Sequence, residues 1–237
     1  MKLAILQARS SSTRLPGKVL APILGTPMLL RQIERVLHST RLDGLVVATS
    51  NNSSDDELAR VVGDNGVIVR RGPLEDVFSR FAQVVDEFKP DTIIRLTGDN
   101  PLADPGVIDD VLRSHDEAGA DYTSNSRVRT YPYGLDVECV RAEAFARLRM
   151  MNLDAAEREH VTMGFYRRPE VFSIHSVTQS RNVSELRWSV DYPSDFDFVT
   201  SVYEYLYPTN PEFTQDDILD LIEAHPHLHH TLSDVPE

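Results

Sequence analysis

The 237-residue sequence has one cysteine, only three lysines and no long apolar run. The single cysteine, Cys139, excludes an internal disulfide bond and fits a reducing cytoplasm. Because Cys139 falls at an alternating position of an apolar run, we interpret it as a buried packing residue and not as a nucleophile.

Membrane and export signals are also missing. No stretch approaches the roughly 20 apolar residues that a membrane-spanning helix needs. The apolar run near the start, residues 3–6, is too short for a signal peptide. We therefore expect a cytoplasmic protein without a membrane partner.

Positive charge is scarce as well, because 24 basic residues face 37 acidic ones and the formal net charge is -13. Nonspecific binding to nucleic acid requires a basic face, so this balance excludes nucleic acid as an expected partner. An acidic protein that binds an anionic ligand has to concentrate its cations locally.

Such a concentration follows the first apolar strand, in the run Gln7-Ala8-Arg9-Ser10-Ser11-Ser12-Thr13-Arg14-Leu15-Pro16-Gly17-Lys18. Three cations stand there beside four hydroxyls, a combination that suits a polyphosphate. The run contains neither GxxxxGK[ST] nor GxGxxG, so it is neither a Walker loop nor a dinucleotide fingerprint. A solvated surface loop is the plain alternative.

Strands and helices are expected to alternate through the first half. Strands are predicted over 3–7, 44–48, 67–70 and 92–96, and helices over 28–38, 55–63 and 74–88. Repeated strand-helix-strand units indicate a parallel sheet with helices on both faces.

The second half is less regular. Further strands are expected over 121–125 and 135–140, and helices over 142–151, 155–166, from 194 onward and over 214–224. Residues 171–177 and 186–190 are predicted to pair as an antiparallel hairpin. Ser194 and Asp197 form a capping-box pattern at the start of the helix from 194.

The whole predicts one Rossmann-like, three-layer α/β/α domain over residues 1–224, with a mixed, mostly parallel sheet and a small β-rich arm. Residues 225–237 are expected to form a poorly ordered C-terminal tail. Its histidines lack a cysteine partner, so we do not interpret them as a metal site.

Two aspartates close predicted strands far apart in the sequence, Asp99 and Asp191. Ligands of open α/β sheets bind outside the carboxyl ends of the strands. Mg²⁺ prefers hard oxygen ligands and commonly bridges protein to phosphate, so both residues are candidate metal ligands. From the residues alone, Asp99 could equally form a turn and Asp191 could cap the next helix.

Three further polar residues are candidate site residues. Asp136 and Glu138 face the same side of a predicted strand, and either could meet a sugar hydroxyl or the metal. A solvated strand face is the alternative for this pair. His160 reads from the sequence alone as a polar residue on a helix face.

The stretch Ser12-Thr13-Arg14-Leu15-Pro16-Gly17-Lys18 resembles the signature loop of the cytidylyltransferases that activate acidic sugars, and it is nearly identical to that of 3-deoxy-manno-octulosonate cytidylyltransferases. The whole chain is most similar to the spore coat polysaccharide biosynthesis protein F branch, and acylneuraminate cytidylyltransferases are a more distant likeness. The resemblance implies a GT-A-like nucleotidyltransferase that transfers CMP from CTP to an acidic sugar or a small phosphate or phosphonate in surface polysaccharide or related biosynthesis. It also implies a homodimer, with residues 121–140 as the dimerisation arm.

The same resemblance implies roles for individual residues. Arg9, Arg14 and Lys18 would be catalytic, since they would stabilise the pyrophosphate that leaves, and Asp99 and Asp191 would hold Mg²⁺. The implied nucleotide-binding residues are Ala8, Arg9, Ser12, Ala48, Arg71, Asp76 and Thr97. The implied acceptor-binding residues are Asp136, Glu138 and His160. Spacing does not choose between Arg70 and Arg71, and Asn100 stands where the octulosonate enzymes carry Glu, which leaves the acceptor open.

Other functions remain as alternatives. A sugar-1-phosphate nucleotidylyltransferase using UTP or GTP usually has a denser glycine run than the Ser10-Ser11-Ser12 stretch found here. A glycosyltransferase would need a DxD metal motif, and Asp195-Phe196-Asp197 matches it only at a predicted helix start. A noncatalytic nucleotide-binding module would not need Lys18 and Asp99.

Overall fold

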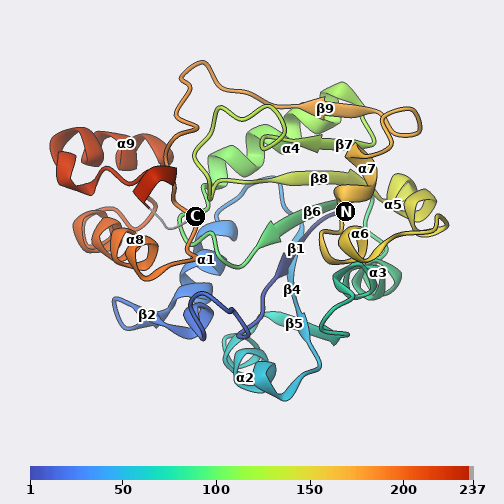
Figure 1. The fold of residues 1–237 in the computed structure, drawn as a ribbon, viewed down its shortest axis with the longest axis horizontal. Coiled ribbons are helices and arrows are strands. Elements are labelled where there is room, and N and C mark those ends of the chain that lie inside the picture. The colour runs from blue at the N-terminus through green and yellow to red at the C-terminus, as the bar shows by residue number, and fades with distance from the viewer. Residues whose placement is uncertain (235–237) are drawn as a thin grey trace.

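A seven-stranded sheet forms the centre of the protein, whose computed structural model describes residues 1–234. Its strands are β1 (Lys2–Gln7), β4 (Gly44–Ser50), β5 (Ile68–Gly72), β6 (Thr92–Thr97), β7 (Tyr122–Ser124), β8 (Glu138–Arg141) and β9 (Ile174–Ser176). They lie in the order β5-β4-β1-β6-β8-β7-β9 (Figure 1). The first four are parallel, β8 is antiparallel to both of its neighbours, and β9 is parallel to β7. The predicted mixed, mostly parallel sheet is confirmed.

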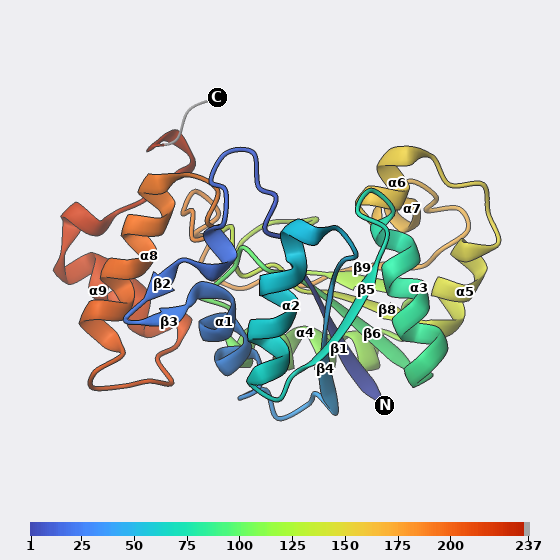
Figure 2. The same ribbon diagram turned by 90° about the horizontal axis from the view of Figure 1, so that it is seen from below.

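Helices cover both faces of this sheet (Figure 2). On one face lie α1 (Met28–Val36), α2 (Asp56–Asp64), α4 (Pro105–Ala118), α8 (Pro193–Leu206) and α9 (Gln215–Ala224). The other face carries α3 (Val77–Phe88), α5 (Ala142–Arg149), α6 (Ala155–Glu159) and α7 (Met163–Tyr166). Within residues 1–234 none of these helices has the length and apolarity to cross a membrane.

Side chains along β1 point alternately to the two faces of the sheet, so this strand contributes to both apolar cores. Ala4 and Leu6 pack into the apolar cluster on the α1 side, and Leu3 and Ile5 pack into the cluster on the α3 side. A parallel strand buried on both faces reads as a continuous apolar run, which is why sequence predicts it well. The three-layer architecture is therefore confirmed.

One helix was not predicted. α4 occupies 105–118, a stretch to which the sequence patterns assigned no element. Its start has a standard cap, because the Asp104 side chain accepts hydrogen bonds from the amides of Gly106 and Val107 and a proline follows at the first helical position. Gly119 ends it at a positive φ of 61°.

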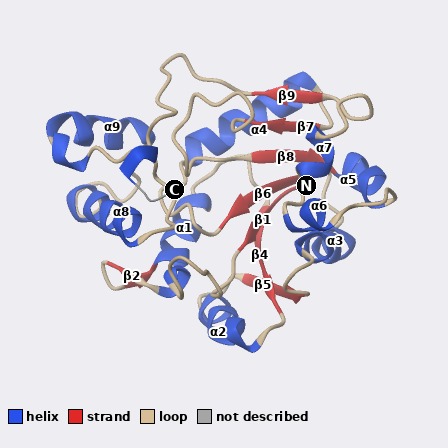
Figure 3. Cartoon of the chain, in the orientation of Figure 1, coloured by secondary structure: helices blue, strands red, loops and turns tan. Residues whose placement is uncertain are grey.

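The predicted hairpin of 171–177 with 186–190 is wrong. β9 pairs with β7 in parallel, and residues 186–190 contain only isolated bridges, from Leu186 to Thr231 and from Arg187 to Tyr133. The backbone of 186–188 is engaged elsewhere: the Tyr133 amide donates to the Leu186 carbonyl, the Trp188 amide donates to the Tyr133 carbonyl, and the Arg187 amide donates to the His230 carbonyl. Long connections without helix or strand join β7 to β8 and β9 to α8 (Figure 3).

The predicted helix over 155–166 is divided into α6 and α7. Val161 has a φ of 45°, which an α-helix does not allow, and it turns the chain between the two short helices. The turn brings the Thr162 hydroxyl within 2.7 Å of Glu138 Oε1, to which it donates. α3 begins at Val77 and not at Leu74, because Asp76 caps it by accepting from the Ser79 amide.

Within residues 121–140, β7 and the start of β8 lie in the central sheet, and the connection between them contains no helix or strand. Tyr122 and Tyr131 are buried within the chain's own core, and Cys139 is fully buried, as predicted. The small two-stranded β-element lies elsewhere, as the hairpin of β2 (Pro22–Ile23) and β3 (Thr26–Pro27).

The C-terminal segment is ordered against the domain, so the prediction of a poorly ordered tail is wrong for residues 225–234. Short 3-10 helices form at η3 (Pro226–Leu228) and η4 (Leu232–Asp234). Leu228 and His230 are buried, while His227 and His229 are exposed. The rest of the predicted tail, 235–237, lies outside the described residues.

Candidate functional site

A cavity of about 400 Å³ opens at the carboxyl ends of β1 and β6, the edge at which open α/β sheets bind ligands. The loop that follows β1 forms one wall, and the residues after β6 form the floor. The predicted site residues that line it are Ala8, Arg9, Ser12, Arg14, Lys18, Thr97, Asp99, His160 and Asp191. Residues separated by most of the chain thus converge on one cavity.

The loop after β1 is fixed at both of its ends. Gly17 has a φ of 73°, a conformation that suits glycine, and its amide donates to the Ser10 carbonyl. At the other end, buried Asp55 accepts from the Ser10 amide at 2.7 Å and from the Ser50 hydroxyl. Asp55 was missed from the sequence because it stands in what reads as an ordinary first helical turn.

The three loop cations differ in how they are held. The Lys18 ammonium group donates to Asp191 Oδ1 at 3.0 Å and to the Val190 carbonyl, and it lies 4.0 Å from Asp99 Oδ2. Arg14 is 3.2 Å from Asp191 Oδ2. Arg9 has no ion pair within residues 1–234, so its charge is available to an anion in the cavity.

Asp99 and Asp191 offer a donor set that fits Mg²⁺. Asp99 Oδ1 is buried and has no hydrogen-bond partner within residues 1–234, which leaves it free to ligate. Burial acts to raise the pKa of Asp191, but the charge of Lys18 and hydrogen bonds from Lys18 and Arg187 outweigh it and hold that pKa below its usual range. Mg²⁺ commonly takes one or two carboxylates and completes its shell with phosphate and water.

No group of three or more His, Cys, Asp or Glu side chains that could hold a metal occurs in the described part of the chain. Two carboxylates that share Lys18 match a metal whose remaining ligands come from a nucleotide.

The alternative in which Asp191 caps α8 is excluded, because Tyr192 is the N-cap residue and Asp195 accepts from the Tyr192 amide at 2.9 Å. The predicted capping box of Ser194 and Asp197 is therefore wrong.

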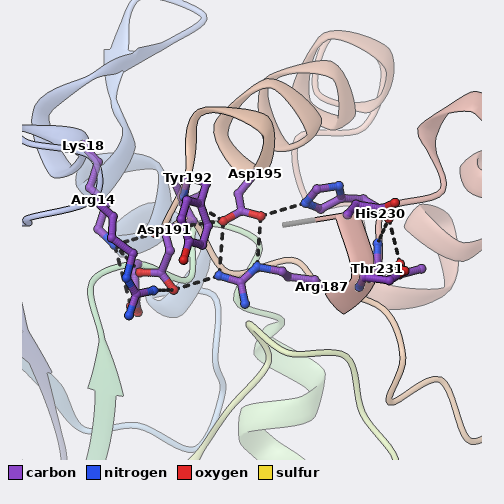
Figure 4. A network of polar contacts seen from close by, with 12 residues as sticks. Arg14, Lys18, Arg187, Asp191, Tyr192, Asp195, His230 and Thr231 are labelled. Atoms are coloured by element: carbon purple, nitrogen blue, oxygen red, sulfur yellow. Dashed lines mark hydrogen bonds and ion pairs between the residues drawn. The ribbon is translucent and has the colours of Figure 1, made fainter. Parts of the chain in front are cut away.

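Behind Asp191 lies a chain of polar contacts that ends at His230 (Figure 4). Arg187 joins Asp191 to Asp195, and Asp195 in turn contacts the His230 ring. Burial acts to raise the pKa of Asp195, but hydrogen bonds from His230, Arg187 and two backbone amides lower it far below its usual range. Because Asp195 is fully engaged, the Asp195-Phe196-Asp197 run does not offer a DxD metal motif.

A second cavity of about 320 Å³ adjoins the first and shares Arg95, Thr97 and His160 with it. The predicted acceptor residues Asp136, Glu138 and His160 all line this cavity. Arg127 lines it too, with its guanidinium 4.0 Å from the centre of the Tyr166 ring and no carboxylate partner within residues 1–234.

The two acidic residues of the second cavity have different surroundings. Burial acts to raise the pKa of Glu138, but the Arg95 charge and hydrogen bonds from Tyr122 and Thr162 lower it below its usual range. Glu138 is thus fully occupied. Burial raises the pKa of Asp136, against the opposing effect of Arg129 at 2.6 Å.

Three predicted nucleotide-binding residues lie outside the lining of both cavities. Ala48 is fully buried, and its carbonyl accepts from the Ala8 amide. Arg71 donates to the Ser50 and Asn52 carbonyls near the end of β4, and Asp76 caps α3 and pairs with Arg158. Arg70 pairs with Glu87 on α3.

Sequence reasoning also missed three arginines that line the cavities, Arg80, Arg95 and Arg127. Arg95 donates to Gln7 Oε1 at 3.0 Å and pairs with Glu138, so it stands at the boundary of the two cavities. The sequence did give a signal for Arg95, because a single arginine within the apolar run of β6 is unusual enough to mark a site residue. Arg127 follows β7 in a polar stretch that gives no such signal.

Comparisons with known proteins agree with this geometry. A family model described as cytidylyltransferase matches residues 3–217. The spore coat polysaccharide biosynthesis protein SpsF of Bacillus subtilis is 32% identical, over 94% of this chain and 95% of its own length. A solved cytidylyltransferase from Leptospira borgpetersenii superposes with a TM-score of 0.90 at 28% identity, covering 97% of this chain and 96% of the other.

A further solved structure shares the fold alone. CMP:2-keto-3-deoxy-manno-octonic acid synthetase complexed with CTP superposes with a TM-score of 0.67 at 19% identity. The match covers 86% of this chain and 98% of that protein. The two proteins therefore share the arrangement of sheet and helices described above.

Proposed function

The chain belongs to the cytidylyltransferase family, a family of nucleotidyltransferases, and we propose that it transfers CMP from CTP to a small acidic acceptor with release of pyrophosphate. The observation that carries the proposal is the adjacency of two cavities that share Arg95, Thr97 and His160. The larger one, lined by three loop cations and two aspartates, would take the nucleotide. The smaller one would take the acceptor.

In the proposed reaction an ionised acceptor oxygen attacks the α-phosphorus of CTP. A bond forms between that oxygen and phosphorus, the bond from the α-phosphorus to the bridging oxygen breaks, and its electron pair leaves on pyrophosphate. Arg9, Arg14 and Lys18 would stabilise the charge that grows on the leaving group. Catalysis then comes from positioning and fixed charge, without a covalent intermediate.

Asp99 and Asp191 would hold the Mg²⁺ that we expect as cofactor. When bound, the ion would neutralise phosphate charge and help to fix the triphosphate. Lys18 lies between the two carboxylates, so it would keep them in place before the nucleotide arrives.

Charge in the smaller cavity supports an acidic acceptor. Arg95 is already neutralised by Glu138, while Arg127 has no carboxylate partner in residues 1–234 and is available to a carboxylate or phosphate. Asp136 would accept a hydrogen bond from an acceptor hydroxyl. The similarity to SpsF supports a place in surface polysaccharide biosynthesis.

The homodimer and the cytoplasmic location stay predictions from the family resemblance. The proposed arm over 121–140 still presents an exposed surface at Arg127 and Val128. Analytical ultracentrifugation of the purified protein tests the dimer, since a single monomeric species would contradict it.

Pyrophosphate release tests the proposed reaction. The protein is incubated with Mg²⁺, each of the four nucleoside triphosphates and a panel of acidic sugars, small phosphates and phosphonates, and EDTA serves as the metal-free control. Release with CTP alone and dependent on one acceptor supports the proposal and identifies the acceptor. Release with UTP or GTP instead contradicts the choice of CTP, and no release with any combination contradicts nucleotidyl transfer.

A further inference from the structure

On the side away from the cavity, Asp191 is held by hydrogen bonds to its carboxylate and from its backbone amide. Its Oδ2 accepts from Arg187 Nη2 at 2.8 Å, and its amide donates to Asp195 Oδ2 at 2.7 Å. Arg14 and Lys18 contact the same carboxylate from the cavity side. Two of its cationic neighbours therefore face the cavity and one faces the protein.

Asp195 ties these contacts together. Its side chain is 1% exposed, and it accepts from Arg187 through two nitrogens, at 3.0 and 3.2 Å. It also accepts from the amides of Asp191 and Tyr192. Such paired hydrogen bonds fix the plane of the guanidinium, and hence the direction from which Arg187 meets Asp191.

His230 closes this arrangement from the C-terminal segment. Its Nε2 lies 2.7 Å from Asp195 Oδ1, and because an ionised carboxylate only accepts, Nε2 carries the hydrogen. Its carbonyl accepts from the Arg187 amide at 3.0 Å. The ring is buried and stacks on Phe198, with centroids 5.3 Å apart. His230 thus contacts both residues that hold Asp191 (Figure 4).

We propose that His230 is a positioning residue of the nucleotidyl-transfer site, which acts through Asp195 and Arg187 to hold Asp191 in place. The proposal rests on the proposed function, which gives Asp191 its role. Arg14 and Lys18 would turn part of their charge toward phosphate when a nucleotide binds. Arg187 cannot follow them, because Asp195 and His230 retain it, so Asp191 keeps one fixed partner through the reaction.

The test compares four variants of the full chain. His230→Ala removes the ring, and His230→Gln returns an amide nitrogen that can donate to Asp195. His229→Ala removes the exposed neighbouring ring. Leu228→Ala removes buried apolar contact from the same segment without touching Asp195, so it controls for loss of stability alone. Thermal midpoints show how far each variant is destabilised.

Two kinds of measurement are made on each variant. Pyrophosphate release gives kcat, the KM for CTP and the Mg²⁺ concentration for half-maximal rate. Hydrogen exchange of the amides of Asp191 and Tyr192, which donate to Asp195, needs no turnover. Fluorescence of Trp188, the single tryptophan, reports on the same segment because that side chain is fully buried beside Arg187.

We expect His230→Ala to lower kcat by about 10- to 100-fold, the range for residues that orient a metal ligand, and to raise the Mg²⁺ requirement. Both amides should exchange faster, and His230→Gln should recover most of the loss. Leu228→Ala and His229→Ala should retain kcat and the Mg²⁺ requirement.

The proposal is overturned if His230→Ala leaves both kcat and the hydrogen exchange of the two amides unchanged. It is also overturned if Leu228→Ala, at an equal loss of thermal stability, lowers kcat as much as His230→Ala does. Wild-type protein that releases no pyrophosphate overturns the proposed function instead. The exchange and fluorescence results then still decide whether His230 holds the segment around Asp191.

Discussion

The carboxylate of Asp55 accepts a hydrogen bond from the amide of Ser10 at 2.7 Å, although the two residues lie 45 positions apart in the sequence. Ser10 begins the hydroxyl-rich part of the loop that lines the larger cavity, and Asp55 is fully buried. One side chain from the start of α2 therefore fixes the loop that carries the cations.

Replacing that carboxylate should weaken both the fold and nucleotide binding. Asp55→Ala leaves the amides of Ser10 and Ser50 without their acceptor, so the free energy of unfolding should fall by about 2 kcal/mol. CTP affinity should fall about tenfold or more, because the loop loses its support. Calorimetric titration with CTP measures the second effect. Asp64→Ala, at an exposed acid of the same helix, is the control and should bind CTP normally.

Lys18→Ala should lower kcat by about a hundredfold, since under the proposed function it removes a fixed charge that would stabilise the leaving pyrophosphate. The fold should persist, because Arg14 and Arg187 still neutralise Asp191. Steady-state pyrophosphate release measures kcat. The control is Lys89→Asn, at an exposed lysine whose left-handed conformation asparagine tolerates. Equal rates for the two variants would remove Lys18 from the catalytic set.

Arg127→Ala should raise the KM for the acceptor by about tenfold or more, the equivalent of one charge-assisted hydrogen bond. The KM for CTP should stay the same, because Arg127 lines the smaller cavity alone. Kinetics with each substrate varied in turn separate the two constants. Arg113→Ala, at an exposed arginine of α4, should leave both unchanged. A rise in the KM for CTP would place Arg127 on the nucleotide side.

Two glycines should respond to alanine in opposite directions. Gly134 has a φ of 108°, and an added Cβ would lie 2.6 Å from the backbone of Trp188 and Ser189, so Gly134→Ala should destabilise the protein by about 2 kcal/mol or more. Gly63 lies in α2 with nothing within 4 Å, so Gly63→Ala should stabilise it by about 0.5 to 1 kcal/mol. Urea unfolding measures both. Stabilisation by Gly134→Ala would show that the contact with Trp188 relaxes freely.

His115 should make stability depend on pH. Burial lowers the pKa of His115 to about 4 from an ordinary value of 6.5. Within residues 1–234 its Nε2 has no hydrogen-bond partner, so a proton added there would find no acceptor. Between these values the unfolded chain binds a proton that the native protein does not, so stability is complete above pH 6.5 and falls as the pH decreases toward 4. The loss amounts to about 3 kcal/mol.

Urea midpoints at a series of pH values from 7 to 4 measure this loss. His115→Gln should flatten the profile in that window, because the variant has no ring to titrate. His229→Gln, at an exposed histidine, should leave the slope of the wild type. A His115→Gln profile parallel to the wild type would assign the pH dependence to other groups.

The elements that the sequence predicted are those whose signals come from residues close together in the chain. β1, β4 and β6 are continuous apolar runs because both faces of a parallel strand are buried, and the cations of the first loop are neighbours in the chain. α4 was missed, although local signals mark both of its ends: Asp104 and the following proline at the start, and Gly119 at the end.

The remaining features depend on contacts that no local pattern contains. The stretch 186–190 is apolar enough to read as a strand, but its backbone forms hydrogen bonds with Tyr133 and His230 and not with a strand of the sheet. Lys18 meets Asp191 across 173 residues, and only the fold shows that the two share a cavity. The support of Asp191 by His230 is of the same kind.

That 173-residue separation between Lys18 and Asp191 also orders events during synthesis of the protein. Translation begins at the amino terminus, so the ribosome produces the cation loop long before the aspartate that opposes it. A nascent chain that stops within α5 would carry the loop without Asp191, and it would lack one of the two carboxylates proposed to hold Mg²⁺. Under the proposed function, nucleotidyl transfer therefore has to wait until Asp191 has been synthesised and has met Lys18.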